Sequence, residues 1–317
     1  MVTATTNAAP RVHPALDNTV VKLLDASMAS STHRLYNKVV TSFSVYLLKY
    51  FSIPMYIPLK VHHIMGYVAY LHHKGYSGST IASYISALSY FHKIRGSPDP
   101  TNSYLIRKLI MGSSSLTKPS RVHLPITQQV LHTLISSVSC LSLSQYNVIM
   151  LQSMFYLAFH AFLRVGELTR SSASNHTLQL NDVSLVQGQS RYIKIIVSFK
   201  SFKHKKDYYP TSIVIQSKEA HCPVLSLVRY LRIRPKFPGP LYIFSDKSPV
   251  TSSFFYSSLR QCLLHSGLDP LQHRGHSFRI GAATMAASMG YSETQISAMS
   301  RWNSNAFKKY VRIPSIS

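Results

Sequence analysis

HSFRIGAAT at residues 276–284 and RWNSNAFKKY at residues 301–310 are the two stretches that decide how this chain is interpreted. The first stretch is predicted to be helical. His276 stands three residues before Arg279, and on a helix this spacing puts both side chains on one face. An imidazole, a guanidinium group and the Tyr310 phenol are groups that can take part in phosphate chemistry.

Two further stretches upstream carry candidate reactive groups. AFLRVGELT at residues 161–169 holds Arg164 and Glu167, and SFK at residues 198–200 ends in Lys200. Each signal is weak alone, because a single arginine is usually solvated or ion-paired and a single histidine or tyrosine is usually structural. The order of the four motifs along the chain therefore carries the functional information.

The surroundings of these motifs predict a mainly helical domain with a small β-sheet over residues 126–317. YIKIIVSF, residues 192–199, is β-branched and aromatic and predicts a strand. YYPTSIVIQ, residues 208–216, is its expected hairpin partner, joined through the cationic SFKHKKD at 201–207. Helical patterning is predicted at 127–138, 143–160, 223–233, 252–265 and 276–289.

The N-terminal part predicts a separate all-helical domain over residues 31–111. Thr32 is the expected N-cap of its first helix, and further helices are predicted at 60–73, 79–95 and 102–111. The first 30 residues are expected to form a flexible tail with a short helix near 20–29. GSSSLTKPSRVHLP, residues 112–125, predicts a basic interdomain linker.

The charge indicates a polyanionic partner. Lys and Arg number 34 against 10 Asp and Glu, for a formal net charge of +24. Double-stranded DNA is the first candidate, since phosphate neutralisation supplies most of its sequence-independent affinity. An anionic membrane surface is the alternative, but no apolar stretch approaches the roughly 18 to 20 residues that a spanning helix needs. The N-terminus has no secretory pattern, so a nuclear or cytoplasmic location is expected.

The reactive residues do not predict a metal site or a cofactor. The three cysteines are far apart and form no CxxC pair. The ten carboxylates are scattered, whereas two-metal nucleases need several of them together. The pairs His62–His63 and His72–His73 consist of adjacent residues, which point to different helix faces.

The four motifs, in this order, resemble the tyrosine recombinase (phage integrase) family. HSFRIGAAT followed by RWNSNAFKKYVR is especially similar to the DIRS-like and Crypton-like branch of eukaryotic retroelements. The resemblance covers about residues 30–313. It implies a helical, SAM-like core-binding domain followed by a catalytic domain, and a site-specific recombinase or integrase that works on DNA as a homo-oligomer, by analogy a tetramer.

The resemblance also implies roles for individual residues. Tyr310 matches the nucleophile that forms a covalent 3′-phosphotyrosine, and Arg164 with Arg279 matches the arginine pair that binds the phosphate. His276 and Trp302 would flank that phosphate. Religation of the phosphotyrosine needs no ATP, and two arginines suit the charge of the transition state without a metal.

A general acid and the DNA contacts complete the expected site. Lys200 best matches the lysine that protonates the leaving 5′-oxygen, although its neighbours offer alternatives. Glu167, three residues after Arg164, is expected to be a carboxylate that buttresses the site without contacting the phosphate itself. Phosphate contacts are expected from Arg34, Lys38, Lys118, Arg121, Lys203 and Lys205.

Two features depart from the family pattern, and two other functions stay open. Ser300 stands where close relatives have glycine, which we expect to be tolerated. Only seven residues follow Tyr310, which leaves little room for the C-terminal helix that many relatives exchange between protomers. A type IB topoisomerase uses the same chemistry. A DNA-binding protein that has lost the ability to cleave DNA is a further alternative. Such a protein should have lost at least one of Arg164, His276, Arg279 and Tyr310, whereas this sequence contains all four.

Overall fold

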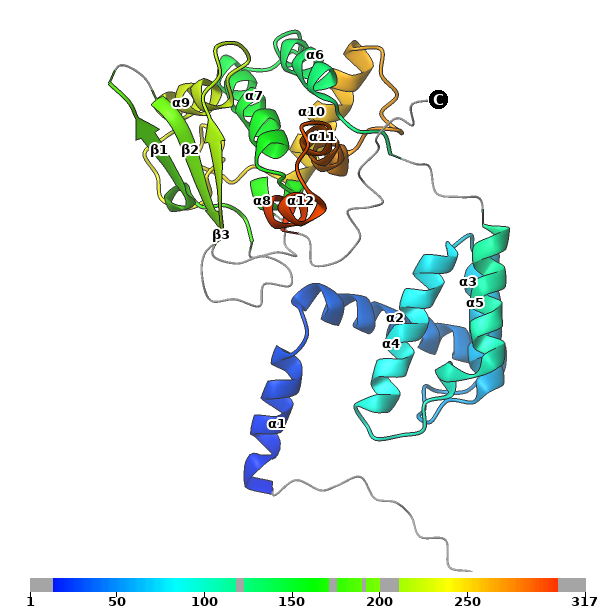
Figure 1. Cartoon of the computed structure of the whole chain (residues 1–317). Helices are drawn as coiled ribbons and strands as arrows, with labels where there is room; N and C mark the ends of the chain where they lie inside the picture. The colour runs from blue at the N-terminus through cyan, green and yellow to red at the C-terminus, as the bar shows by residue number, and fades with distance from the viewer. Residues whose placement is uncertain (1–13, 118–122, 171–175, 190–191, 200–210, 302–317) are drawn as a thin grey trace, which may run out of the picture. The chain divides into compact units, whose positions relative to one another are not determined.

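The computed structural model describes residues 14–117, 123–170, 176–189, 192–199 and 211–301. The chain divides into two compact units, residues 1–120 and 121–317, which are described separately below. Helices dominate both, and the described part contains one three-stranded sheet (Figure 1). The predicted mainly helical fold with a small β-sheet is confirmed. None of the described helices combines the length and the hydrophobicity needed to cross a bilayer.

The N-terminal unit is built from helices joined by short connections. They are α1 (Pro14–Ala26), α2 (Ser30–Phe51), α3 (Val61–His73), α4 (Gly78–Lys93) and α5 (Tyr104–Leu116), with the 3-10 turn η1 (Pro100–Asn102) before α5. Helix α2 packs on α3 and α4, and α5 packs on the same two helices. Ser77 caps α4 by accepting a hydrogen bond from the backbone N–H of Thr80.

Aromatic rings close the core of this unit. The rings of Phe43 and Tyr67 meet edge to face with centroids 4.8 Å apart, and Tyr46 lies 5.2 Å from Tyr67. Such pairs add about 0.5 to 1.5 kcal/mol each beyond the area they bury. His92 of α4 is fully buried, and its Nε2 accepts the backbone N–H of Leu59 at 3.0 Å. This bond fixes the connection before α3 onto α4.

Three predicted boundaries in this unit are wrong. Helix α1 begins at Pro14, because proline suits the first turn of a helix and the following residues favour helix. Helix α2 begins at Ser30 rather than after Thr32, and Ala29 takes the N-cap position. Helix α5 continues to Leu116, since Ser113 is buried and its hydroxyl bonds to His72 at 2.9 Å. The first residues of the predicted linker are therefore helical.

The C-terminal unit contains the remaining elements. Its helices are α6 (Gln128–Val138), α7 (Gln145–His160), α8 (Val165–Leu168), α9 (Pro223–Ile233), α10 (Ser252–His265), α11 (Gly275–Ser288) and α12 (Glu293–Ser300), with the 3-10 turn η2 (Leu180–Asp182). Its strands are β1 (Val183–Gln187), β2 (Tyr192–Phe199) and β3 (Thr211–Gln216). Strand β1 and helix α12 were not predicted from the sequence.

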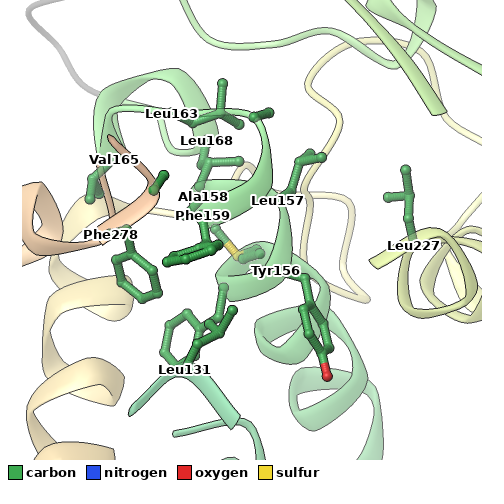
Figure 2. Close-up of a cluster of buried hydrophobic side chains, with 14 of the residues drawn as sticks. Leu131, Tyr156, Leu157, Ala158, Phe159, Leu163, Val165, Leu168, Leu227 and Phe278 are labelled. Carbon is green, nitrogen blue, oxygen red and sulfur yellow. The ribbon is translucent and has the colours of Figure 1, made fainter. Parts of the chain in front are cut away.

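Helix α7 forms the centre of this unit. Its residues from Met150 to Phe159 are buried, apart from Gln152, because α6, α9 and α11 all pack against it. Figure 2 shows Phe159 of α7 among Leu131 of α6 and Phe278 of α11. A helix that is apolar nearly all round is typical of the interior of a larger domain. The burial of α7 therefore fixes the start of the segment that follows it, residues 161–164.

The sheet flanks this core in the order β1-β2-β3 with antiparallel pairing. On β2 the side chains of Ile195, Val197 and Phe199 are buried and alternate with less buried ones, as a half-buried strand requires. Helix α9 packs on β2 and β3. The register pairs Phe199 with Thr211, so β2 and β3 form the predicted hairpin, whose connection at 201–207 lies outside the described residues.

Candidate active site

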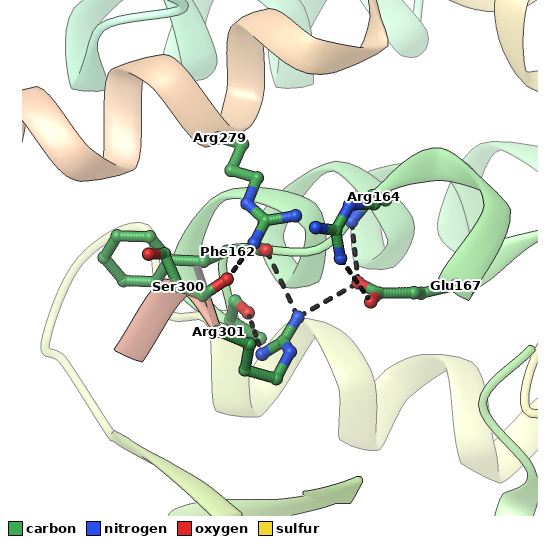
Figure 3. Close-up of polar contacts among 7 residues, drawn as sticks. Phe162, Arg164, Glu167, Arg279, Ser300 and Arg301 are labelled. Atoms are coloured by element: carbon green, nitrogen blue, oxygen red, sulfur yellow. Dashed lines mark hydrogen bonds and ion pairs between the residues drawn. The ribbon is translucent and has the colours of Figure 1, made fainter. Parts of the chain in front are cut away.

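Four segments of the C-terminal unit converge on one cluster of charged side chains (Figure 3). Arg164 occupies the N-cap position of the short helix α8, and Glu167 lies inside that helix. Arg279 comes from α11, and Arg301 follows the last residue of α12. Strand β2 reaches the cluster through its last residue, Phe199, whose ring lies 3.7 Å from the guanidinium carbon of Arg301.

Two glycines let α11 approach the other segments closely. A Cβ at Gly281 would overlap the backbone carbonyl of Ile126, and one at Gly275 would overlap the Val165 side chain. The backbone N–H of Ile126 donates to Ser277 of α11 at 2.9 Å. A larger residue at Gly275 would push α11 away from α8, and one at Gly281 would push α11 away from the segment before α6. Gly275 therefore permits the close approach of α11 to the turn that holds Arg164.

Arg164 and Glu167 lock the turn that starts α8. The backbone N–H of Arg164 donates to Oε2 of Glu167 at 2.8 Å, and its Nη1 donates to Oε1 at 3.3 Å. The Glu167 side chain is 6% exposed, whereas that of Arg164 is 35% exposed. The carboxylate thus holds an arginine whose side chain is about one third exposed. The role predicted for Glu167, a carboxylate that buttresses the site, stays a prediction.

Arg279 reaches the same region from α11, although 115 residues separate it from Arg164 in sequence. It is fully buried, and its Nη2 donates to the backbone carbonyl of Ser300. Figure 3 shows the guanidinium groups of Arg279 and Arg164 near each other, one from α11 and one from the start of α8. Two forked cations can bind the oxygens of one phosphate, but Arg279 is 0% exposed here, so a phosphate could reach it only if the groups that cover it moved.

His276 lies on α11 one helical turn before Arg279. Burial, together with the nearby charges of Arg279, Arg164 and His123, lowers the pKa of His276 to about 4. The imidazole is therefore neutral at physiological pH. A neutral imidazole can both accept and donate a proton, which fits the role predicted for His276.

Arg301 is a member of this cluster that the sequence analysis missed. Its side chain is fully buried and forms an ion pair with Glu167, with Nη2 3.0 Å from Oε2. Nη2 also donates to the carbonyl of Phe162 at 3.3 Å, and Nη1 to that of Ala161 at 3.4 Å. Burial lowers the pKa of Arg301, while Glu167 raises it. No local pattern marks this residue, because an arginine is usually solvent-exposed.

The backbone at Arg301 adopts φ 56°, in the left-handed region that costs a non-glycine residue about 1 to 2 kcal/mol. Phe162, which accepts one of its hydrogen bonds, also has a positive φ of 51°. Ser300, noted above as a departure from glycine, lies in the last helical turn of α12 and donates its hydroxyl to Ile296 at 2.6 Å. The left-handed residue is therefore Arg301, and serine at 300 fits without strain.

The other predicted site residues lie elsewhere or outside the described part of the chain. Arg34 and Lys38 are exposed on α2 of the N-terminal unit. The predicted residues outside the described part are Lys118, Arg121, Lys200, Lys203, Lys205, Trp302 and Tyr310. In sequence, Lys200 directly follows Phe199 and Trp302 directly follows Arg301. Phe199 and Arg301, which contact each other, are thus each followed in the sequence by a predicted catalytic residue.

Comparison with known protein families identifies the N-terminal unit. Residues 23–95 match the family described as phage integrase, N-terminal SAM-like domain. No curated protein sequence matches the chain. The predicted SAM-like character of the N-terminal domain is confirmed by the family match.

Solved structures resemble the chain over most of its length. The XerH site-specific recombinase, bound to its palindromic difH substrate in a post-cleavage complex, superposes with a TM-score of 0.62 at 14% identity, covering 86% of this chain and 75% of that one. A lambda integrase dimer bound to a COC′ core site gives 0.61 at 13%, covering 95% and 77%. The Tn1549 transposon integrase in complex with circular intermediate DNA gives 0.56 at 14%, covering 82% and 83%. The fold is therefore that of the tyrosine recombinases.

Proposed function

We propose that this protein is a site-specific DNA recombinase or integrase that cleaves and rejoins DNA through a covalent bond between Tyr310 and a 3′-phosphate. One observation carries the proposal. Arg164, His276 and Arg279, which the motifs selected from distant parts of the sequence, lie near one another in a fold shared with site-specific recombinases, and the buried Glu167 binds Arg164. The finer assignment to a DIRS-like or Crypton-like mobile element rests on the sequence motifs alone.

The proposed reaction is a transesterification in two symmetrical steps. The Tyr310 oxygen attacks phosphorus, the bond to the 5′-oxygen breaks, and that oxygen leaves as a hydroxyl after taking a proton. A 5′-hydroxyl of the partner strand then attacks the phosphotyrosine and releases the phenol. The pentavalent transition state gains negative charge on its non-bridging oxygens, which the forks of Arg164 and Arg279 would neutralise.

Proton transfer is assigned to two groups in the proposal. His276 stays neutral because burial lowers its pKa to about 4, so it can accept a proton from the attacking phenol and return it later. Lys200 is the proposed donor to the leaving 5′-oxygen, since the resemblance places the general acid in this hairpin. The hairpin strand β2 that leads to Lys200 ends beside the arginine cluster.

DNA binding follows from the charge and from the exposed cations. The net charge of +24 favours phosphate neutralisation, and Arg34 and Lys38 are exposed on α2. The relatives of similar fold were solved as complexes with DNA, and the lambda integrase among them as a dimer. A homo-oligomer on DNA, by analogy a tetramer, is the proposed active state.

The test is covalent trapping. The protein is incubated in EDTA with a pool of nicked duplexes that lose the short 5′-hydroxyl fragment after cleavage, and a denaturing gel then separates adducts. An adduct that disappears in Tyr310→Phe and persists in Tyr291→Phe supports the proposal, because Tyr291 is an exposed tyrosine of the same unit. Sequencing of the trapped strand identifies the recombination site.

Two results would replace the proposal. Retarded duplexes in a native gel without any adduct would favour the catalytically silent DNA-binding protein. Adduct formation with relaxation of supercoiled plasmid, but without exchange of strands between two duplexes carrying the trapped site, would favour the type IB topoisomerase.

A further inference from the structure

We infer that Arg301 is a positioning residue for the proposed strand transfer: it fastens the end of α12 to the Arg164–Glu167 turn and so sets the geometry of Arg164. The inference rests on the proposed function for its consequence in catalysis. The positioning of Arg164 is inferred from the contacts of Arg301 alone.

Arg301 and Arg164 share one carboxylate, that of Glu167. Oε2 of Glu167 accepts both the backbone N–H of Arg164 at 2.8 Å and Nη2 of Arg301 at 3.0 Å. Oε1 of Glu167 bonds to Nη1 of Arg164. A carboxylate held by three bonds has little freedom to rotate, because each bond restricts a different direction. Removing Arg301 would release Oε2 on one side and loosen the support of Arg164.

Arg301 also fixes the backbone that leads into Arg164. Its guanidinium group donates to the carbonyls of Ala161 and Phe162, three and two residues before Arg164. Phe162 holds the left-handed φ of 51° in this segment. A conformation of this kind persists only when the surroundings impose it. Arg301 supplies part of that constraint through the Phe162 carbonyl.

An arginine at position 301 lowers the stability of the fold in two ways. Arg301 itself holds a left-handed φ of 56°, which glycine would adopt without strain. Its charge is also fully removed from solvent. A strained backbone together with a buried charge is a poor way to gain stability, and such combinations cluster at functional sites. The contacts of Arg301 with both sides of the cluster account for its presence.

The matched control is Arg234. This residue is also buried and donates to the backbone carbonyls of Leu241, Pro235, Phe237 and Pro240. Its contacts lie in the loop after α9 and include none with Glu167 or Arg164. Arg234→Met and Arg301→Met therefore remove the same kind of group, but only one of the two variants touches the cluster.

The experiment measures single-turnover adduct formation on the duplex recovered by trapping. Loss of Arg301 misplaces Arg164 without removing it, so Arg301→Met is expected to slow adduct formation about 100-fold. Arg301→Lys is expected to retain about one tenth of the rate, since it keeps the charge and loses the fork. Arg234→Met is expected to stay within about threefold of the parent rate, and duplex affinity is expected to change less than about threefold in all variants.

The decisive comparison is the double variant with Arg164→Ala. If Arg301 acts through Arg164, the double variant reacts within about threefold of Arg164→Ala alone, because residues that act as a unit are not additive. Multiplicative losses, or a rate for Arg301→Met equal to that of Arg234→Met, would overturn the inference and leave the proposed function standing. If Arg301→Met fails to fold, Arg301→Lys, which keeps a counter-charge for Glu167, takes its place in the comparison with Arg164→Ala.

Hydrogen exchange tests the positioning of Arg164 by Arg301 independently of the proposed DNA cleavage. In the free full-length protein, Arg301→Met is expected to speed exchange of the amides at residues 162–167 by about tenfold relative to Arg234→Met. Unchanged exchange would contradict the inference even if the parent protein cleaves DNA. Faster exchange in a protein that forms no adduct would retain the positioning of Arg164 and remove the proposed strand transfer.

Discussion

The two units of the molecule differ in where they keep their charges. Within residues 14–117 the buried polar residues are His63, His92, Thr101 and Ser113, while Arg34 and Lys38 remain exposed on α2. The C-terminal unit buries Glu167, Asp182, Arg234, Arg279 and Arg301. An exposed cation binds a polyanion through many weak and mobile contacts. A buried cation stays at a fixed position, which a transition state requires.

The contrast teaches that composition alone does not locate a reactive site. Both units carry excess arginine and lysine, yet among the residues that the structure describes it is in the C-terminal unit that a carboxylate binds two arginines. In the N-terminal unit, Asp99 accepts bonds from Ser89 and Thr101, and its cation Lys93 is largely exposed at 3.6 Å. The first arrangement holds buried cations at fixed positions, and the second caps a helical turn.

The largest effect that would sharpen this contrast is expected from Glu167→Ala. The substitution leaves Arg301 buried without its counter-charge, so the free energy of unfolding should fall by about 3 to 5 kcal/mol. The matched change in the other unit, Asp99→Ala, should cost about 1 kcal/mol, because it removes a cap and leaves its cation in water. Urea denaturation of both variants measures the difference. Equal losses would mean that the buried pair contributes no more than a surface cap.

An intermediate effect is expected from acid. Burial lowers the pKa of His160 to about 3 and that of His276 to about 4, so the folded C-terminal unit binds fewer protons than its unfolded chain between pH 6.5 and 4. The stability of this unit is therefore fully present above about pH 6.5 and decreases as the pH falls through that window. In the N-terminal unit, burial and the neighbouring His62 lower the pKa of His63 in the same direction.

Hydrogen exchange at pH 7 and pH 5 measures this effect separately in each unit. Amides of α7 and α11 should lose more protection on acidification than those of α3 and α4. His160→Gln removes one of the titrating groups and should reduce the loss in α7. If the two units lose protection equally, the buried histidines do not distinguish them.

The smallest effect on stability is expected from Arg34→Ala and Lys38→Ala. Both residues are exposed, so unfolding free energies should change by less than about 0.5 kcal/mol. Each substitution should nevertheless weaken duplex binding and reduce the slope of log affinity against log salt by about 1. Fluorescence anisotropy across a salt series provides the measurement, with the exposed neutral neighbour Asn37→Ala as control. An unchanged slope would place the DNA contacts elsewhere.

The sequence predicted elements that carry strong local signals. Helices α9 and α10 have the predicted bounds, because a proline or a capping Thr251 marks their starts and apolar periodicity runs through them. Strand β1 was missed, since VSLVQ is short and gains its order from pairing with β2. Helix α12 was missed because ETQISAMS has little apolar periodicity, and its capping residue Ser292 alone did not identify it.

The candidate site was predictable only as far as motifs reach. Arg164, Glu167, His276 and Arg279 were selected in the sequence, and the structure brings them together. Arg301 could not be selected, because its role depends on a left-handed backbone and on carbonyls 139 and 140 residues earlier in the chain. No local pattern encodes such a contact. The roles of Trp302 and Tyr310 stay predictions.

The shared carboxylate of Glu167 constrains the order in which this sequence can evolve. A lineage that first replaced Glu167 by a neutral residue would leave Arg301 buried without a counter-charge. A lineage that first replaced Arg301 by glycine would relieve the left-handed backbone, and Arg164 would still balance the carboxylate. The second route costs less stability, although it would slow the proposed strand transfer. In descendants no longer selected for that reaction, Arg301 should therefore be lost before Glu167, 134 residues away.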